Sequence, residues 1–143
     1  AWQQSELRAR GGKAKVVKEG TDLTIVCYAL MVHHAMAVAA ELEAEGKSVE
    51  VIDLRTIAPW DKETVLASVA KTGRLMIVHE AVKEHGVGAE IAAVVNKDLF
   101  GKLKAPVERL GAAFCAVPFS KPLEAAFVPN PGTIGAAARA MLG

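Results

Sequence analysis

The candidate catalytic residues of this sequence lie within 76–91, MIVHEAVKEHGVGAEI. An apolar run leads there directly into His79 and Glu80, an imidazole beside a carboxylate, and both side chains serve as general acids and bases. The same two side chains can instead fasten a strand end to its neighbours, since a ring nitrogen donates or accepts and the carboxylate can accept backbone N–H groups of the glycine turn that follows. We favour packing or an interface over proton transfer, and we expect loss of either side chain to destabilise the domain by about 1–3 kcal/mol.

The glycines of GVGAEI (86–91) suggest a second chemistry, dinucleotide binding. That fingerprint requires a third glycine where Ile91 stands, and no ribose-binding acid follows at the right distance. Gly86 and Gly88 therefore predict a tight turn and the close approach of a helix, not a nucleotide site.

Four histidines raise the possibility of a metal site. His33 and His34 are adjacent, and neighbouring side chains on a helix point about 100° apart, so one metal rarely takes both. His33 still matters because it falls in the first turn of a predicted helix, on the expected functional edge. The sequence contains no Gly-x-Ser-x-Gly and no Walker loop. The residues alone thus predict no catalytic, cofactor-binding or metal-binding set.

Size and composition indicate one globular domain, with 143 residues, 52% of them hydrophobic and 23% charged. A net charge of +1 without a basic block argues against nucleic acid. The most apolar stretch, 23–42, is interrupted by two histidines and does not read as a membrane span. Cys27 lies in an apolar run, which predicts a buried thiol, and Cys115 is far from it in the sequence. The two cysteines do not form a disulfide framework, so a reducing compartment fits best.

The elements that must position these residues alternate between short apolar runs and amphipathic segments. Strands are predicted over 14–17, 23–28, 49–54, 75–78 and 106–110. Helices are predicted over 31–45, from Asp61 to about 71, over 87–99, and from Asn130-Pro131 onwards. The proline-rich stretch 111–130 reads as a loop. The order predicts an α/β domain with a mainly parallel five-stranded sheet and helices on both faces. The first strand is expected at an edge, with an antiparallel orientation as one option.

Polar residues follow the carboxyl ends of these strands, where ligands bind in open α/β sheets. Tyr28 ends the second strand, and Asp53 and Arg55 end the third. Two residues apart on a strand, Asp53 and Arg55 share one face. They form either a surface ion pair or the support of the loop that holds Pro59 and Trp60.

Four stretches are GKAKVVKEGTDLTIVCYALMVHHA, VEVIDLRTIAPWDKETVLASVAKTGRLMIVHEA, GVGAEIAA and VPFSKPLEAAFVP. They resemble the C-terminal domain of the E1 β chain of 2-oxoacid dehydrogenases, a transketolase C-terminal-like domain. The resemblance covers about residues 12–142. We therefore expect a lead-in or linker over 1–11 and this one domain over 12–143.

The resemblance implies a part of a thiamine-diphosphate-dependent enzyme with two α and two β chains, which decarboxylates a 2-oxoacid and acylates the lipoyl group of an E2 acyltransferase. Thiamine diphosphate and magnesium would bind in the parent assembly, and this domain alone would bind neither and be inactive. The implied partners are the E1 α and β chains and the E2 subunit-binding domain, with no nucleic acid and no membrane. The implied location is the cytoplasm, or the mitochondrial matrix for a eukaryotic parent. The alternative is a stand-alone binding or assembly module without an enzymatic role.

The family's Val-His-Glu-Ala and Met-Val-His motifs match 78–81 and 31–33, and neither holds the family's proton-transfer histidine. We call the edge of the sheet at the carboxyl ends of the strands the rim. The candidate residues for an interface or for this rim are His33, Asp53, Arg55, His79, Glu80, Gly86, Gly88, Phe114 and Phe119. Phe114 stands where many relatives carry an acid, which leaves charge-based docking to a basic E2 domain open. With Phe119 and Phe127 it predicts an apolar patch. RTIAPWD is closer to branched-chain enzymes and GVGAEI to pyruvate enzymes, so the substrate stays open.

Overall fold

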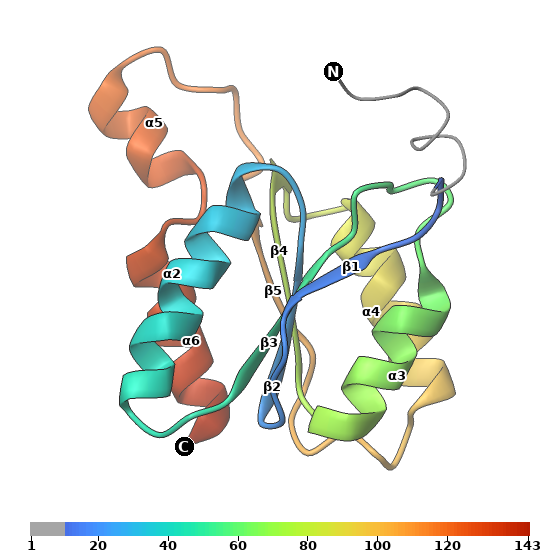
Figure 1. Ribbon diagram of the computed structural model, residues 1–143. Coiled ribbons are helices and arrows are strands. Elements are labelled where there is room, and N and C mark those ends of the chain that lie inside the picture. The colour runs from blue at the N-terminus through green and yellow to red at the C-terminus, as the bar shows by residue number, and fades with distance from the viewer. Residues whose placement is uncertain (1–10) are drawn as a thin grey trace, which may run out of the picture.

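The structure of the chain is a computed structural model that describes residues 11–143 (Figure 1). The expected lead-in over 1–11 therefore lies outside the described residues except for its last position. The strands are β1 (Lys15–Lys18), β2 (Leu23–Cys27), β3 (Val49–Asp53), β4 (Leu75–Val82) and β5 (Glu108–Ala112). The helices are α2 (Leu30–Ala44), α3 (Lys62–Thr72), α4 (Val87–Asp98), α5 (Lys121–Phe127) and α6 (Pro131–Leu142).

The five strands form one sheet in the order β1-β3-β2-β4-β5. β2, β3, β4 and β5 run parallel, and β1 pairs antiparallel with β3 at one edge, with a register shift between Val16 and Lys18. The predicted α/β class, the strand count and the edge position of the first strand are confirmed. The strands with continuous apolar runs, β3, β2 and β4, lie in the middle of the sheet. Their side chains are mostly apolar on both faces because a parallel sheet is covered on both faces.

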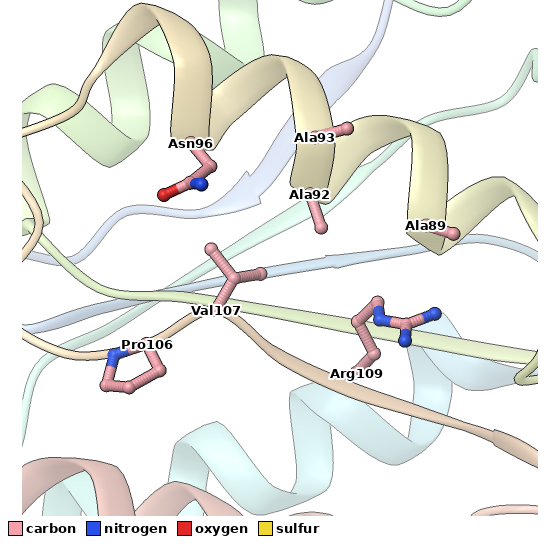
Figure 2. Close-up of a pocket in the computed structure, with 7 residues that line it drawn as sticks. All are labelled: Ala89, Ala92, Ala93, Asn96, Pro106, Val107 and Arg109. Atoms are coloured by element: carbon pink, nitrogen blue, oxygen red, sulfur yellow. The ribbon is translucent and has the colours of Figure 1, made fainter.

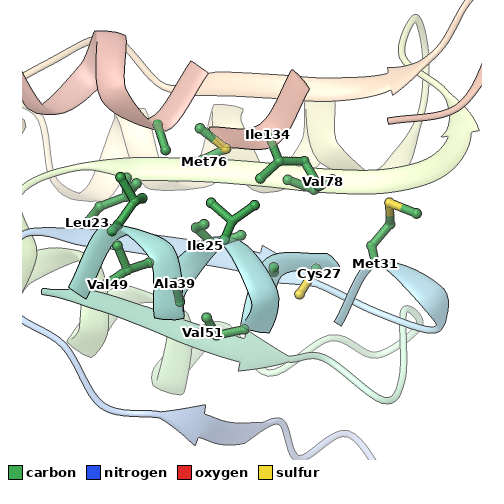
Figure 3. Close-up of a cluster of buried hydrophobic side chains, with 14 residues drawn as sticks. Leu23, Ile25, Cys27, Met31, Ala39, Val49, Val51, Met76, Val78 and Ile134 are labelled. Carbon is green, nitrogen blue, oxygen red and sulfur yellow. The ribbon is translucent and has the colours of Figure 1, made fainter. Parts of the chain in front are cut away.

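Helices α2 and α6 cover one face of the sheet, and α3 and α4 cover the other (Figure 1). Alternate residues of each strand point to opposite faces, so Ile25 packs under α2 while Val26 packs under α3 and α4. On the first face, Met31 and Ile134 bring the two helices onto the strands (Figure 3). The core is thus two apolar layers divided by one sheet.

Local signals in the sequence set several helix ends. Asp61 accepts a hydrogen bond from the Thr64 N–H and caps α3, and Gly73, at φ 74°, ends that helix in the left-handed region. Asn130 caps α6 and accepts from the Thr133 N–H. These predicted caps are confirmed, so the helix boundaries follow from a few polar side chains and one glycine.

Two predictions about secondary structure were wrong. The stretch 111–130 was predicted as a loop, yet β5 extends to Ala112 and α5 occupies Lys121–Phe127. Pro122 lies in the first turn of α5, where a proline loses no helical hydrogen bond, so it starts this helix rather than preventing it. The strand predicted to end at Val78 continues to Val82, with a register shift in its pairing with β5.

Candidate functional site

The parallel strands bring three of the noted polar positions to one edge of the sheet. Cys27 of β2 pairs with Asp53 of β3 and with Val78 of β4. Tyr28 follows β2 and Asp53 ends β3 at the carboxyl edge, as predicted, whereas His79 lies within β4, which continues to Val82. Because Val78 is the last residue of β4 that pairs with β2, His79 stands where the regular ladder gives way to the rim.

His79 is fully buried, with no exposed surface. Its Nδ1 lies 2.9 Å from the carbonyl oxygen of Ala81, to which it donates in the neutral tautomer. Its Nε2 is buried and has no hydrogen-bond partner within residues 11–143. Burial lowers the pKa of His79, against the raising effect of the Ala81 carbonyl, and the nearby Arg109 charge lowers it further. The ring is thus held neutral at physiological pH, with one satisfied and one unsatisfied nitrogen.

Three glycines leave just the space that the His79 ring fills. A Cβ at Gly86 would stand 3.0 Å from ring atom Cε1, and one at Gly111 would stand 2.9 Å from the same atom. A Cβ at Gly88 would stand 2.9 Å from Nε2. The predicted tight turn and close helix approach at Gly86 and Gly88 are confirmed, and the group they approach is His79. Gly111 of β5 was not foreseen in this contact.

Tyr28 lies beside the buried ring, and Glu80 follows His79 in β4. The Tyr28 and His79 rings stack with centroids 6.2 Å apart and planes 26° apart. Burial, and then the Glu80 charge, raises the pKa of Tyr28. Glu80 is half-buried, and no hydrogen bond or ion pair involves its carboxylate within residues 11–143. The expected bond from the glycine turn to Glu80 is therefore not formed there: the histidine, not the carboxylate, meets the glycines.

The loop after β3 joins Asp53 to Arg55. The Asp53 Oδ1 accepts a hydrogen bond from the Arg55 N–H at 3.1 Å, and Arg55 Nε lies 3.7 Å from Asp53 Oδ2. Arg55 is not on the strand, because β3 ends at Asp53 and Arg55 has φ 59°. The two residues thus form the ion pair considered from the sequence, and the backbone contact also fixes the first turn of the loop.

His33 lies on α2 beside this rim with an exposed side chain. Residues 11–143 contain no group of three or more His, Cys, Asp or Glu side chains that could hold a metal ion. Cys27 is buried as predicted, and burial, then the charge of Asp53, raises the pKa of its thiol to about 12. A general base must lie within hydrogen-bond reach of the proton that it moves. The His79 ring has no exposed surface in this conformation, so it does not meet this condition here.

Two further surfaces lie outside the rim residues named from the sequence. A groove of about 410 Å³ separates α4 from the edge strand β5 (Figure 2). Its lining comprises Ala89, Ala92, Ala93, Asn96, Pro106, Val107 and Arg109. The small alanine side chains of α4 leave this space open. The groove was not predicted from the sequence, because it depends on a strand edge, which has no signal of its own in the sequence.

Large apolar side chains are exposed on the segment 113–123, which we call the apolar arm. Phe114 is 77% exposed, Val117 is 74% exposed, and Phe119 is fully exposed. The arm leads into α5, which stands beyond the carboxyl edge of the sheet, at the top of Figure 1. The patch predicted around Phe114 and Phe119 is therefore at the surface, whereas Phe127 is half-buried and lines a small pocket under α5. Among the described residues, no helix has the length and apolar character needed to cross a membrane.

The fold defines a class: an α/β domain with four parallel strands, one antiparallel edge strand, and polar residues on the carboxyl rim. The family model for the transketolase C-terminal domain matches residues 12–134, and the chain belongs to this family. It is 45% identical over 128 residues to the β subunit of acetoin:2,6-dichlorophenolindophenol oxidoreductase from Cupriavidus necator, covering 90% of this chain and 38% of that protein. It is also 45% identical over 131 residues to the pyruvate dehydrogenase E1 component subunit beta of Bacillus subtilis, covering 92% and 40%. The chain thus spans about two fifths of the length of these relatives.

Solved structures agree with this assignment. One, described as split gene transketolase in an inactive beta4 tetramer, matches with a TM-score of 0.78 and 29% identity, covering 92% of this chain and 41% of that one. A 2-oxoglutarate:ferredoxin oxidoreductase from Magnetococcus marinus matches with a TM-score of 0.61 and 12% identity, which supports the fold alone. The predicted family is confirmed.

Proposed function

We propose that this chain is the C-terminal domain of the β subunit of a thiamine-diphosphate-dependent 2-oxoacid dehydrogenase E1 component. The 45% identity to two β subunits, over nine tenths of the chain, carries the proposal. In this role the domain supports assembly with α and β chains and offers a docking surface to the E2 subunit-binding domain. The assembly decarboxylates a 2-oxoacid and passes the acyl group to lipoyl-E2, in the cytoplasm or, for a eukaryotic parent, the mitochondrial matrix.

A chimera tests this function. The matching part of the Bacillus subtilis β subunit is replaced by residues 12–143 and coexpressed with its α subunit. We expect a heterotetramer that decarboxylates a 2-oxoacid and acylates lipoyl-E2. The parent β subunit is the positive control, and the same subunit truncated before the replaced domain is the negative control. A folded chimera that never joins the α subunit would contradict the proposal and favour a stand-alone module.

The residues of this domain do not fit thiamine diphosphate and magnesium themselves. Magnesium binds through oxygen ligands set close together, usually with the phosphates of its partner. On the rim, Asp53 is engaged by Arg55, and the His79 ring is sealed beneath three glycines. We infer that the cofactor is held elsewhere in the parent assembly. Calorimetric titration of the 143-residue chain with thiamine diphosphate and magnesium should show no saturation, and micromolar binding would overturn the inference.

We assign His79, Gly86 and Gly88 to the architecture of the rim, and the apolar arm to subunit contacts. The support is the close packing of the ring on the one side and the exposure of Phe114 and Phe119 on the other. Contiguous exposed apolar groups on a soluble domain mark interaction sites. Because Phe114 stands where many relatives carry an acid, we expect the docking of a basic E2 domain to depend less on salt than in those relatives.

Sedimentation velocity over a concentration series tests the role of the arm. The 143-residue chain should self-associate with rising concentration, and Phe114→Ser with Phe119→Ser should reduce this association. Lys102→Ser, a change of an exposed polar residue on another face, is the control. A chain that stays monomeric at high concentration would argue against the arm as a contact surface.

A further inference from the structure

Residues 12–14, which we call the N-terminal strap, cross the loop between β3 and α3 before β1 begins. The Gly12 N–H donates to Thr56 Oγ1 at 3.1 Å, and the Ala14 N–H donates to Asp61 Oδ2 at 3.0 Å. Both donors belong to the backbone, and both acceptors are side chains of one loop. The side chains of the loop therefore hold the strap through the strap's backbone N–H groups.

The strap also fits the loop by shape. Gly12 has φ 77°, in the left-handed region that favours glycine. A Cβ at this position would stand 3.1 Å from Cγ of Pro59, tighter than ordinary contact. A residue with a side chain would thus meet both backbone strain and the proline ring. The contact makes position 12 selective for glycine on two independent grounds.

Asp61 both contacts the strap and caps α3. Its side chain is 2% exposed. Oδ1 accepts the Thr64 N–H at 3.2 Å, and Oδ2 accepts the Thr64 hydroxyl at 2.8 Å in addition to the Ala14 N–H. One buried carboxylate therefore caps the helix and holds the strap through a shared oxygen. Lys13 adds weaker contacts, with Nζ 3.3 Å from the exposed Glu63 carboxylate.

We propose that the loop of residues 54–61 is a clamp that couples the N-terminal strap to the first turn of α3. A displacement of the strap is then transmitted to the helix through Asp61. The stretch IDLRTIAPWD thereby gains a role that is separate from the rim, because Thr56, Pro59 and Asp61 face the strap. The clamp is formed by this chain alone, whichever parent reaction the chain serves.

Amide hydrogen exchange measured by NMR on the 143-residue chain tests the clamp. Thr56→Val removes the acceptor of the Gly12 N–H and leaves every contact of Asp61 in place. Exchange at Gly12 should rise roughly tenfold, the ratio for one lost hydrogen bond, and exchange at Ala14 should rise less, because its bond to Asp61 remains. Exchange at Thr64 should rise by about two- to threefold through the coupling, and exchange at Val69 in the middle of α3 should stay unchanged.

Asp61→Asn should raise exchange at Ala14 and at Thr64 together. Glu63→Gln is the control in the same helical turn: its exposed side chain contacts Lys13 of the strap but accepts no hydrogen bond from Ala14 or Thr64, so exchange at both amides should stay unchanged. If Thr56→Val leaves Gly12 protected, the loop does not hold the strap. If the strap opens while Thr64 stays unchanged, the coupling is refuted. Should Asp61→Asn fail to fold, Gly12→Ala provides the second test: it strains the strap without altering the Asp61 side chain, and exchange at Thr64 should again rise by about two- to threefold through the coupling.

Discussion

The amino and carboxyl ends of this sheet differ in how their buried polar groups are satisfied. At the amino end, Thr24 Oγ1 lies 2.7 Å from Ser68 Oγ and 2.8 Å from Thr72 Oγ1, and all three side chains are buried. Nearby, the buried Glu50 accepts the Gly20 N–H at 3.1 Å and is paired with Lys71. These hydroxyls and the carboxylate fasten α3 to the strands with partners on both sides.

The carboxyl end holds the exceptions. Two buried side-chain nitrogens lack partners within residues 11–143, His79 Nε2 and His34 Nδ1, and both belong to this end. The non-glycine residues with positive φ in the described chain, Ala29, Arg55 and His85, all follow the carboxyl ends of strands. Unsatisfied groups and strained backbone gather where function or contacts over-determine the structure. The contrast indicates that the amino end supplies stability and that the carboxyl end gives some up.

Replacing His79 should have the largest effect. His79→Ala empties a fully buried site and removes the donor to Ala81, so the free energy of unfolding should fall by about 2–4 kcal/mol. The control His33→Ala, on the same rim but exposed, should change it by less than about 0.5 kcal/mol. Glu80→Ala, without a bonded partner among the described residues, should stay below about 1 kcal/mol. Urea denaturation measures all three.

A functional readout then separates packing from chemistry. In the chimeric enzyme, His79→Ala should reduce assembly more than turnover per assembled tetramer. Normal stability and assembly combined with lost decarboxylation would show that His79 is catalytic and that its assignment to the rim architecture is mistaken.

At the amino end, Thr24→Val removes the hydroxyl shared by Ser68 and Thr72. Since Ser68 then loses a buried partner, we expect a loss of about 1–3 kcal/mol in thermal or urea unfolding. Adding Ser68→Ala should recover part of this loss, because two matched apolar groups leave no buried hydroxyl unsatisfied. A Thr24→Val protein as stable as the parent would remove the proposed contrast between the two ends.

Gly88→Ala tests the space around the ring. The new methyl group would stand 2.9 Å from His79 Nε2 and 3.2 Å from Ile77 Cγ2, so overpacking should lower stability by about 1–3 kcal/mol. In a His79→Ala background the methyl group enters the vacated space, and the loss should shrink by at least about 0.5 kcal/mol. Additive effects of the two changes would mean that the ring and the glycine do not constrain each other.

Lowering the pH should reduce the stability of the domain through the protonation of His79. Its pKa is lowered on folding from the ordinary value of 6.5, so below that value the unfolded chain binds the proton first and stability falls with pH. The slope should reach at most about 1.4 kcal/mol per pH unit for this one proton. His79→Gln should flatten the stability curve in this window. Glu50 and Asp61, whose pKa values are lowered on folding from 4.5 and 3.8, should produce a separate loss at lower pH in both proteins.

The smallest expected effect is a gain in stability. Ala29 has φ 53° and ψ −132°, a conformation that suits glycine. Ala29→Gly should therefore raise stability by about 0.5–1 kcal/mol, as relief of strain outweighs the greater freedom of the unfolded chain. Ala40→Gly, at an exposed position in α2, should lose about 1 kcal/mol. If both changes destabilise equally in thermal melts, Ala29 is not strained.

The predictions from the sequence succeeded where the signal is local. Apolar runs, the cap residue Asp61 and Gly73 act within a few positions, so the order of elements and most boundaries followed from them. The rim was located for the same reason, since it depends only on where strands end.

The features that were not predicted lack such a local signal in the sequence. Gly111 lies 32 positions from His79, which it touches, and no spacing rule connects them. Arg55 adopts a positive φ without being glycine, so its residue type gave no warning. Prolines read as loop formers concealed α5, because the same residue type also starts helices.

The short, kinked strand β1 has a consequence for how copies of the domain can meet. An exposed sheet edge invites strands from other molecules, and short length, bulges and lysines discourage this. β1 has four residues, a register shift between Val16 and Lys18, and a lysine at each end. This edge is thereby guarded against amyloid-like strand addition, so crowding during synthesis should favour contacts between side-chain surfaces over continuous intermolecular sheets.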